Sequence, residues 1–167
     1  MKKILLVALA LLVLTMSAAA ADDVKIGQVQ FAAHGTKCFT VLTVAMQGDV
    51  IADAYIDEYQ FMDASAVGVP NSDADFGANF PEGKVLASKK VNADMYSENM
   101  KKAGSTVHLA DNFAAIEAYV TGKTVAELEA AVAGKDAAAM VDAVSGSTLV
   151  DTLGYVNGLI EAAKAAK

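Results

Sequence analysis

This chain contains the stretch Phe39-Thr-Val-Leu-Thr-Val-Ala-Met46, which is followed by the turn residues Gln47-Gly48-Asp49 and by a second run from Val50 to Phe61. Branched and aromatic side chains are enriched in strands because they suit a pleated, half-buried surface. The Gly-Asp pair between two such runs favours a tight turn. The stretch is therefore predicted to form a β-hairpin.

The segments on either side extend this pattern. Val24 to Phe31 alternates apolar and polar residues, which is typical of a half-buried strand, and Ala33 to Thr36 is typical of a turn. Asp63 to Pro81 is rich in turn residues, so we expect a long surface loop there.

Helical periodicity dominates the rest of the chain. The predicted helices are Val91 to Lys102, Asp111 (as N-cap) to about Val120, a segment that begins with the capping box Thr124-Val-Ala-Glu127 and ends at Gly134, Lys135-Asp136 through Val141, and Leu149 to Lys167. Gly154 and Gly158 are expected to loosen the last helix. The predicted fold class is α+β, with N-terminal antiparallel β-hairpins that form a sheet and packed C-terminal helices.

The chain is acidic, and every basic residue is Lys. Without Lys2 and Lys3, the remainder carries 11 Lys against 20 acidic residues, a formal balance of −9. A surface this acidic repels phosphate backbones and anionic lipid headgroups. We therefore expect no nucleic-acid partner, and contact with a membrane only through partner proteins or an uncleaved signal.

Residues 1–21 have the features of an export signal, with Lys2-Lys3 before an apolar run and small residues up to Ala21. Cleavage would leave one domain over residues 22–167, in the periplasm, secreted or at the cell surface. The alternative is an uncleaved N-terminal anchor, since the apolar run is nearly long enough to span a bilayer.

Several polar and aromatic residues receive structural interpretations. Asp57 and Glu58 are expected on opposite faces of a strand as solvated or sheet-edge charges. The only cysteine, Cys38, is expected to be a small buried hydrophobe. Tyr59 and its neighbours Tyr55 and Phe61 are expected to share one strand face with Ile51. Such a face can pack under a planar ligand, but we expect ordinary core.

No metal site is predicted. His34 and His108 lack a second ligand at zinc spacing, and Asp73 with Asp75 lacks the ligand spacing of a calcium loop. Hydrolase chemistry at Ser145 is the weaker alternative, because Ser145 is not in a G-x-S-x-G elbow.

The stretch Asp142-Ala-Val-Ser145-Gly146-Ser147-Thr148 is the best candidate site. A helix entered through Ser-Gly-Ser-Thr offers unpaired backbone N–H groups and the positive end of a helix dipole, and both favour an anion such as phosphate. The bland alternative is a plain helix N-cap.

This stretch resembles the flavinylation motif of the FMN-binding domain family, which reads Asp, Gly or Ala, any residue, Ser or Thr, Gly, Ala or Ser, then Thr. Every specified position is met. Weaker resemblances to the pheromone-precursor branch of that family lie in Gly48-Asp49-Val-Ile with Ala54 to Phe61, and in Tyr119 to Thr124. In that family, domains of cell-surface flavoproteins and of sodium-pumping complexes carry FMN covalently.

The resemblance implies a function and a set of residues. A flavin transferase would attach FMN to Thr148 through a phosphoester, and the domain would shuttle electrons to or from redox partner proteins, as a carrier rather than an enzyme. Ser145, Gly146 and Ser147 would leave room for the phosphate and the transferase, and Asp142 would position the loop or assist the transfer. The rival hypothesis is a non-catalytic exported interaction or signalling protein that keeps the fold without flavin.

Overall fold

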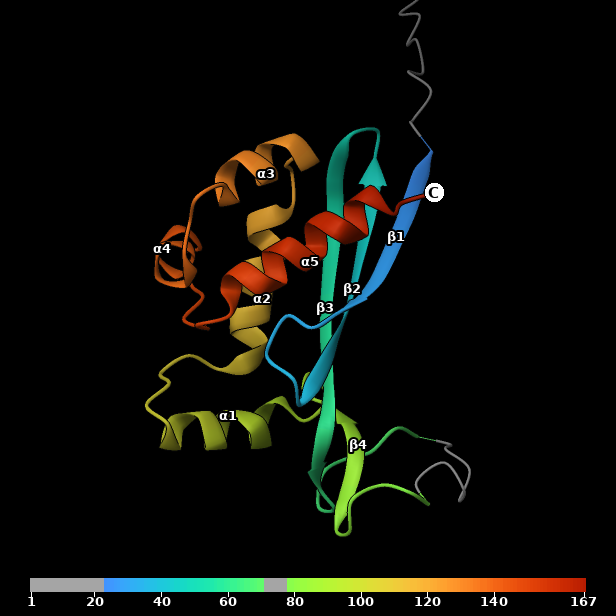
Figure 1. The fold of residues 1–167 in the computed structure, drawn as a ribbon, viewed down its shortest axis with the longest axis vertical. Coiled ribbons are helices and arrows are strands. Elements are labelled where there is room, and N and C mark those ends of the chain that lie inside the picture. The colour runs from blue at the N-terminus through green and yellow to red at the C-terminus, as the bar shows by residue number, and fades with distance from the viewer. Residues whose placement is uncertain (1–22, 71–77) are drawn as a thin grey trace, which may run out of the picture.

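The computed structural model describes residues 23–70 and 78–167. The predicted export signal and the acidic pair Asp73 and Asp75 lie outside the described residues. The α+β prediction is confirmed: a four-stranded antiparallel sheet precedes the helices (Figure 1). The strands are β1 (Val24–Phe31), β2 (Cys38–Gln47), β3 (Val50–Asp63) and β4 (Lys84–Ser88), in the order β1-β2-β3-β4. The short strand β4 had not been predicted.

The helices are α1 (Ala93–Lys102), α2 (Leu109–Val120), α3 (Val125–Val132), α4 (Ala137–Ala143) and α5 (Thr152–Lys164). They lie on one side of the sheet, where α5 crosses β1 and β2 and α2 packs on β3 (Figure 1). The predicted capping box of Thr124 and Glu127 is confirmed at the start of α3. The core between the layers includes Leu42, Ile56, Phe113, Ile116 and Leu159, all fully buried.

Helix α1 begins at Ala93, two residues after the predicted start at Val91. Two further predicted helix starts are wrong. Helix α2 begins at Leu109, because the His108 side chain accepts a hydrogen bond from the Ala110 N–H and acts as the N-cap in place of Asp111. Helix α5 begins at Thr152 rather than at Leu149, and Asp151 is its N-cap residue.

The predicted face assignment of β3 is also wrong, because the strand contains a bulge. Ala45 of β2 pairs with Asp53 and Met46 pairs with Ile51, so β3 has one extra residue between them. A bulge of this kind shifts the alternation of side chains. Ile51 therefore points into the core while Tyr55 is 52% exposed on the outer face.

Asp57 and Glu58 are not solvated charges. They are 7% and 0% exposed respectively. The Asp57 carboxylate accepts hydrogen bonds from the Ser88 hydroxyl at 2.7 Å and from the Glu58 N–H. Glu58 faces the core, where it pairs with the buried Lys89. Burial is tolerated because the sheet and the turn after β4 supply these partners.

The glycines of α5 permit close packing rather than loosening the helix. A Cβ at Gly154 would lie 2.3 Å from the carbonyl oxygen of Ala33, and one at Gly158 would lie 2.5 Å from Leu42 Cδ1. The same close approach occurs on the sheet side, where a Cβ at Gly27 would lie 1.9 Å from the carbonyl oxygen of Ala162. Helix α5 therefore packs so closely against β1 and β2 that there is no room for a side chain at these three positions.

Candidate functional site

The motif stretch connects α4 to α5. Asp142 lies in the last turn of α4, and Ser145 and Gly146 form an exposed turn after it. This turn is closed by the Ser147 N–H, which donates to the carbonyl oxygen of Val144 at 3.1 Å. Gly146 has φ +93°, a conformation that an L side chain rarely adopts. The glycine is thus required by the turn itself.

Buried Asn112 of α2 holds the end of the motif in place. Its side-chain oxygen accepts the Thr148 N–H at 2.7 Å, the Thr148 hydroxyl at 3.3 Å and the Ser147 hydroxyl at 3.4 Å. Its amide nitrogen donates to the carbonyl oxygens of Val107 and His108. Asn112 is 0% exposed, so this amide fixes the motif against the start of α2.

Asn112 had not been identified from the sequence. It shares a helical face with the apolar residues Leu109 and Ile116, where a buried amide needs polar partners. An amide among buried apolar positions was the available signal, but the sequence did not indicate its partner.

Ser147 and Thr148 have different environments. Ser147 is buried, and its hydroxyl lies 2.9 Å from the Thr152 hydroxyl, which donates to the carbonyl oxygen of Leu149. Thr148 is exposed. Ser147 therefore serves the structure of the loop, whereas Thr148 is an exposed residue whose hydroxyl, among the described residues, is held only by the 3.3 Å hydrogen bond to Asn112.

The predicted anion site at a helix start is not formed at Thr148. Because α5 begins at Thr152, Thr148 lies in the loop before the helix. The N-cap residue Asp151 places a carboxylate near that end of α5, and this carboxylate contacts Nδ1 of His34. A phosphate on Thr148 would therefore be held by loop groups rather than by the first turn of α5.

A hollow of about 430 Å³ opens beside Thr148, and we call it the Thr148 hollow. It is lined by the loop of Thr148, Leu149 and Val150, by the end of α1 with Met100, and by His34. Its volume is within the range of roughly 300–1,000 Å³ typical of small-molecule sites. The lining combines apolar side chains with hydroxyls and one imidazole, and its described residues include no Asp, Glu or Lys.

His34 lies in the connection between β1 and β2, and Cys38 is the first residue of β2. The Asp151 carboxylate contacts Nδ1 of His34 and does not contact the other ring nitrogen, Nε2. The Cys38 thiol donates to the carbonyl oxygen of His34 at 2.7 Å. Burial, with the Glu58 charge, raises the pKa of the Cys38 thiol to about 11, so the group is an unreactive thiol at neutral pH.

Asp142 and Ser145 take no part in the hydrogen bonds that connect Asn112 with Ser147 and Thr148. Asp142 is exposed, and among the described residues nothing forms a hydrogen bond or ion pair with its side chain. Ser145 is likewise exposed, and no hydrogen bond within residues 23–70 and 78–167 connects it to a histidine. The geometry thus does not assemble a Ser–His pair at Ser145, and it leaves Asp142 accessible to another protein.

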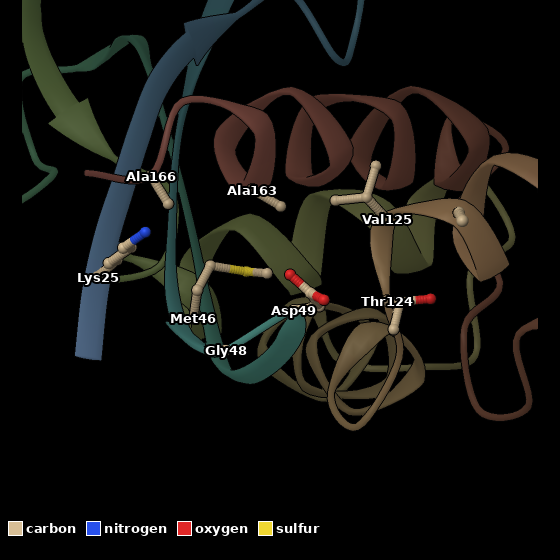
Figure 2. A pocket seen from close by; sticks show the side chains of 9 residues that line it. Lys25, Met46, Gly48, Asp49, Thr124, Val125, Ala163 and Ala166 are labelled. Carbon is tan, nitrogen blue, oxygen red and sulfur yellow. The ribbon is translucent and has the colours of Figure 1, made fainter. Parts of the chain in front are cut away.

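A second hollow, of about 460 Å³, lies beside the turn between β2 and β3, and we call it the hairpin hollow. Figure 2 shows Lys25 and Thr124 at its ends with Asp49 between them, and Ala163 of α5 and Ala166, which follows α5, above. The Thr124 hydroxyl is already bonded to Glu127 in the capping box. The Thr124 hydroxyl is therefore already engaged, and among the described residues no ion pair joins Lys25 to Asp49.

Over residues 23–70 and 78–167, no three His, Cys, Asp or Glu side chains gather as metal ligands. Over the same residues, no helix combines the length and apolar character that crossing a membrane needs. Known protein families, curated proteins and solved structures include no match to this chain.

Proposed function

We propose that this chain is an exported electron-carrying domain to which FMN is attached covalently through a phosphoester on Thr148. The observation that carries the proposal is the position of Thr148: it ends a full match to the flavinylation motif, the residue is exposed, and it borders a hollow of suitable size. The export features of residues 1–21 support it as well, because a covalent tether keeps a flavin from being lost outside the cell.

The motif residues have separate roles in attachment. Thr148 Oγ would attack the FMN phosphorus of FAD in the active site of a flavin transferase, with AMP as leaving group and loss of the hydroxyl proton. Asn112 holds the backbone and hydroxyl of Thr148, and Gly146 forms the turn that presents it. Asp142, the first residue of the motif, is exposed and would contact the transferase, because its negative charge would repel the phosphate itself.

The residues around the Thr148 hollow would hold the cofactor. Met100 and Leu149 supply apolar contact for a planar ring, and His34 supplies a ring nitrogen that can donate or accept a hydrogen bond. When bound, the isoalloxazine ring accepts and donates electrons, and the protein orients it and sets its polarity. The partners on either side of the carrier would be redox proteins.

The test is coexpression of the chain with a flavin transferase, followed by intact-mass measurement. The wild type should be yellow and heavier by FMN less one water. Thr148→Ala should lack both the mass and the colour, whereas Thr148→Ser should retain them because the hydroxyl is kept. Thr106→Ala removes another hydroxyl that lines the Thr148 hollow and should be modified like the wild type.

Two outcomes would reject this proposal. A wild type that stays colourless and unmodified in the presence of an active transferase would favour the non-catalytic interaction protein. Added mass that persists in Thr148→Ala after denaturation would show that the ester forms elsewhere.

A further inference from the structure

The outer face of the sheet contains a third hollow, of about 590 Å³, which we call the Phe39 hollow. It lies where β2 begins, beside the last part of β3. Its lining is Thr36, Lys37, Cys38, Phe39, Tyr59, Gln60, Phe61 and Leu86. None of these residues lines the Thr148 hollow, so the two hollows are separate sites.

The aromatic residues of this hollow are not ordinary core. Phe39 and Phe61 are 41% and 42% exposed. Phe39 is the cross-strand partner of Tyr59, and their rings are nearly parallel, with centroids 5.4 Å apart and an interplanar angle of 14°. Two stacked rings at the surface present an aromatic face on which a further ring can stack.

The ring contacts of this hollow favour a flat ligand. Beside the stacked Phe39–Tyr59 pair, the Phe61 ring meets the Phe80 ring edge to face, with centroids 4.8 Å apart. A planar ring can lie in close contact with such an aromatic surface, whereas the puckered carbons of a saturated ring system make fewer contacts at the optimal separation of roughly 3.5–4.0 Å.

The charge of the hollow favours an anionic group on that ligand. Lys37 is the only charged side chain in the lining, and no carboxylate accompanies it. Within the described part of the chain Lys37 forms no salt bridge. The Cys38 thiol is uncharged at neutral pH, so it does not oppose an anion.

We propose that the Phe39 hollow binds a planar fused-ring aromatic carboxylate or sulfonate, which stacks beside Phe39, Tyr59 and Phe61 and directs its anionic group to Lys37. The aromatic system supplies contact area and the lysine sets the orientation. Binding at this site does not depend on a flavin at Thr148.

The proposal is tested by calorimetric titration of the purified protein with 2-naphthoate. The expected dissociation constant is on the order of 1 mM or tighter, as for a small ligand of this size. Decahydro-2-naphthoate keeps the charge without the flat rings, and 2-naphthamide keeps the rings without the charge. Both should bind at least about fivefold more weakly.

Variants locate the site. Phe39→Ala should weaken naphthoate binding by roughly tenfold, and Lys37→Gln should weaken binding of naphthoate but not of naphthamide. Tyr55→Ala removes an exposed ring from the same face outside the hollow and should leave naphthoate affinity unchanged, as should Lys25→Gln.

The proposal is overturned if naphthoate and its saturated analogue bind equally well, or if naphthoate gives no binding at several millimolar. It is also overturned if Lys37→Gln, whose exposed side chain is not needed for folding, leaves naphthoate affinity unchanged. All of these measurements use unflavinylated protein. They therefore test the Phe39 hollow even if no flavin is attached to Thr148.

Discussion

At the scale of the residue, Asn112 connects the fold to the candidate site. A single side-chain oxygen receives the backbone and hydroxyl of Thr148 and the hydroxyl of Ser147. Hydrogen bonds that share a buried acceptor lose their partner together when the acceptor is removed. The position of the proposed nucleophile thus depends on a residue that the motif does not include.

Asn112→Ala should lower the free energy of unfolding by about 2–3 kcal/mol, because buried polar groups of Ser147, Val107 and His108 lose their partner. Urea unfolding followed by circular dichroism measures this change. Asn99→Ala removes an exposed amide from α1 and should shift stability by less than about 0.5 kcal/mol. Equal effects of the two substitutions would show that the Asn112 network contributes nothing to stability.

At the scale of the element, the close packing of α5 against the sheet depends on two glycines, Gly154 and Gly158, which have no side chain. Glycine in a helix interior is less favourable than alanine by about 1 kcal/mol. In α5 this disadvantage is offset because Gly154 and Gly158 allow the helix to meet the β1–β2 connection and β2 closely. The same contact brings Asp151 to His34 and so forms one wall of the Thr148 hollow.

Gly154→Ala should destabilise the protein by about 1–3 kcal/mol even though alanine is the better helix former, because the new methyl group meets the backbone oxygen of Ala33, which cannot rotate away. The midpoint of thermal unfolding measures the effect. Glu161→Ala, at an exposed position of the same helix, is the matched control and should be nearly neutral. A stabilised Gly154→Ala variant would mean that α5 can move away from the sheet.

At the scale of the whole molecule, one buried polar cluster joins the two layers. Lys89 pairs with Glu58, which also accepts hydrogen bonds from Thr40 and from Tyr155 of α5, each at 2.9 Å. Lys89 also lies 4.6 Å from the ring centroid of Tyr96 in α1. Every buried side-chain polar atom of the described residues has a hydrogen-bond partner. The cluster is thus fully satisfied.

The protonation states of this cluster predict alkaline sensitivity. Burial, followed by the Glu58 charge, raises the pKa of Tyr155 and also raises that of Cys38 from 9.0 to about 11. Burial alone would lower the pKa of Lys89, but attraction to Glu58 and its hydrogen bond outweigh burial and raise it above 10.5. A group whose folded-state pKa is raised stabilises the fold fully below its ordinary pKa, and this contribution is lost as the pH rises through the raised value.

The free energy of unfolding should therefore be steady from neutral pH to about pH 9 and fall between about pH 9 and 11. Thermal unfolding by circular dichroism across this range measures the fall. In Cys38→Ala the decline should begin at a higher pH, because the lowest of the three ordinary pKa values is removed. An unfolding midpoint that stays constant up to pH 11 would contradict the prediction.

The sequence by itself determined the local features of this protein. The strand Val24–Phe31, the turn at Gly48, the capping box at Thr124 and the helical second half were all predicted, because periodicity, turn chemistry and capping involve residues close together in the chain. Thr148 was likewise selected from the local pattern that ends at it.

Only the tertiary structure decided which of these features meet. The bulge in β3 sent Ile51 inward and Tyr55 outward, and packing of α5 buried Glu58 with Lys89. Asn112 and Thr148 are 36 residues apart in the chain. Such contacts depend on how closely helices and sheet approach, and on the requirement that each buried polar group find a partner. Neither condition leaves a periodic signal in the sequence.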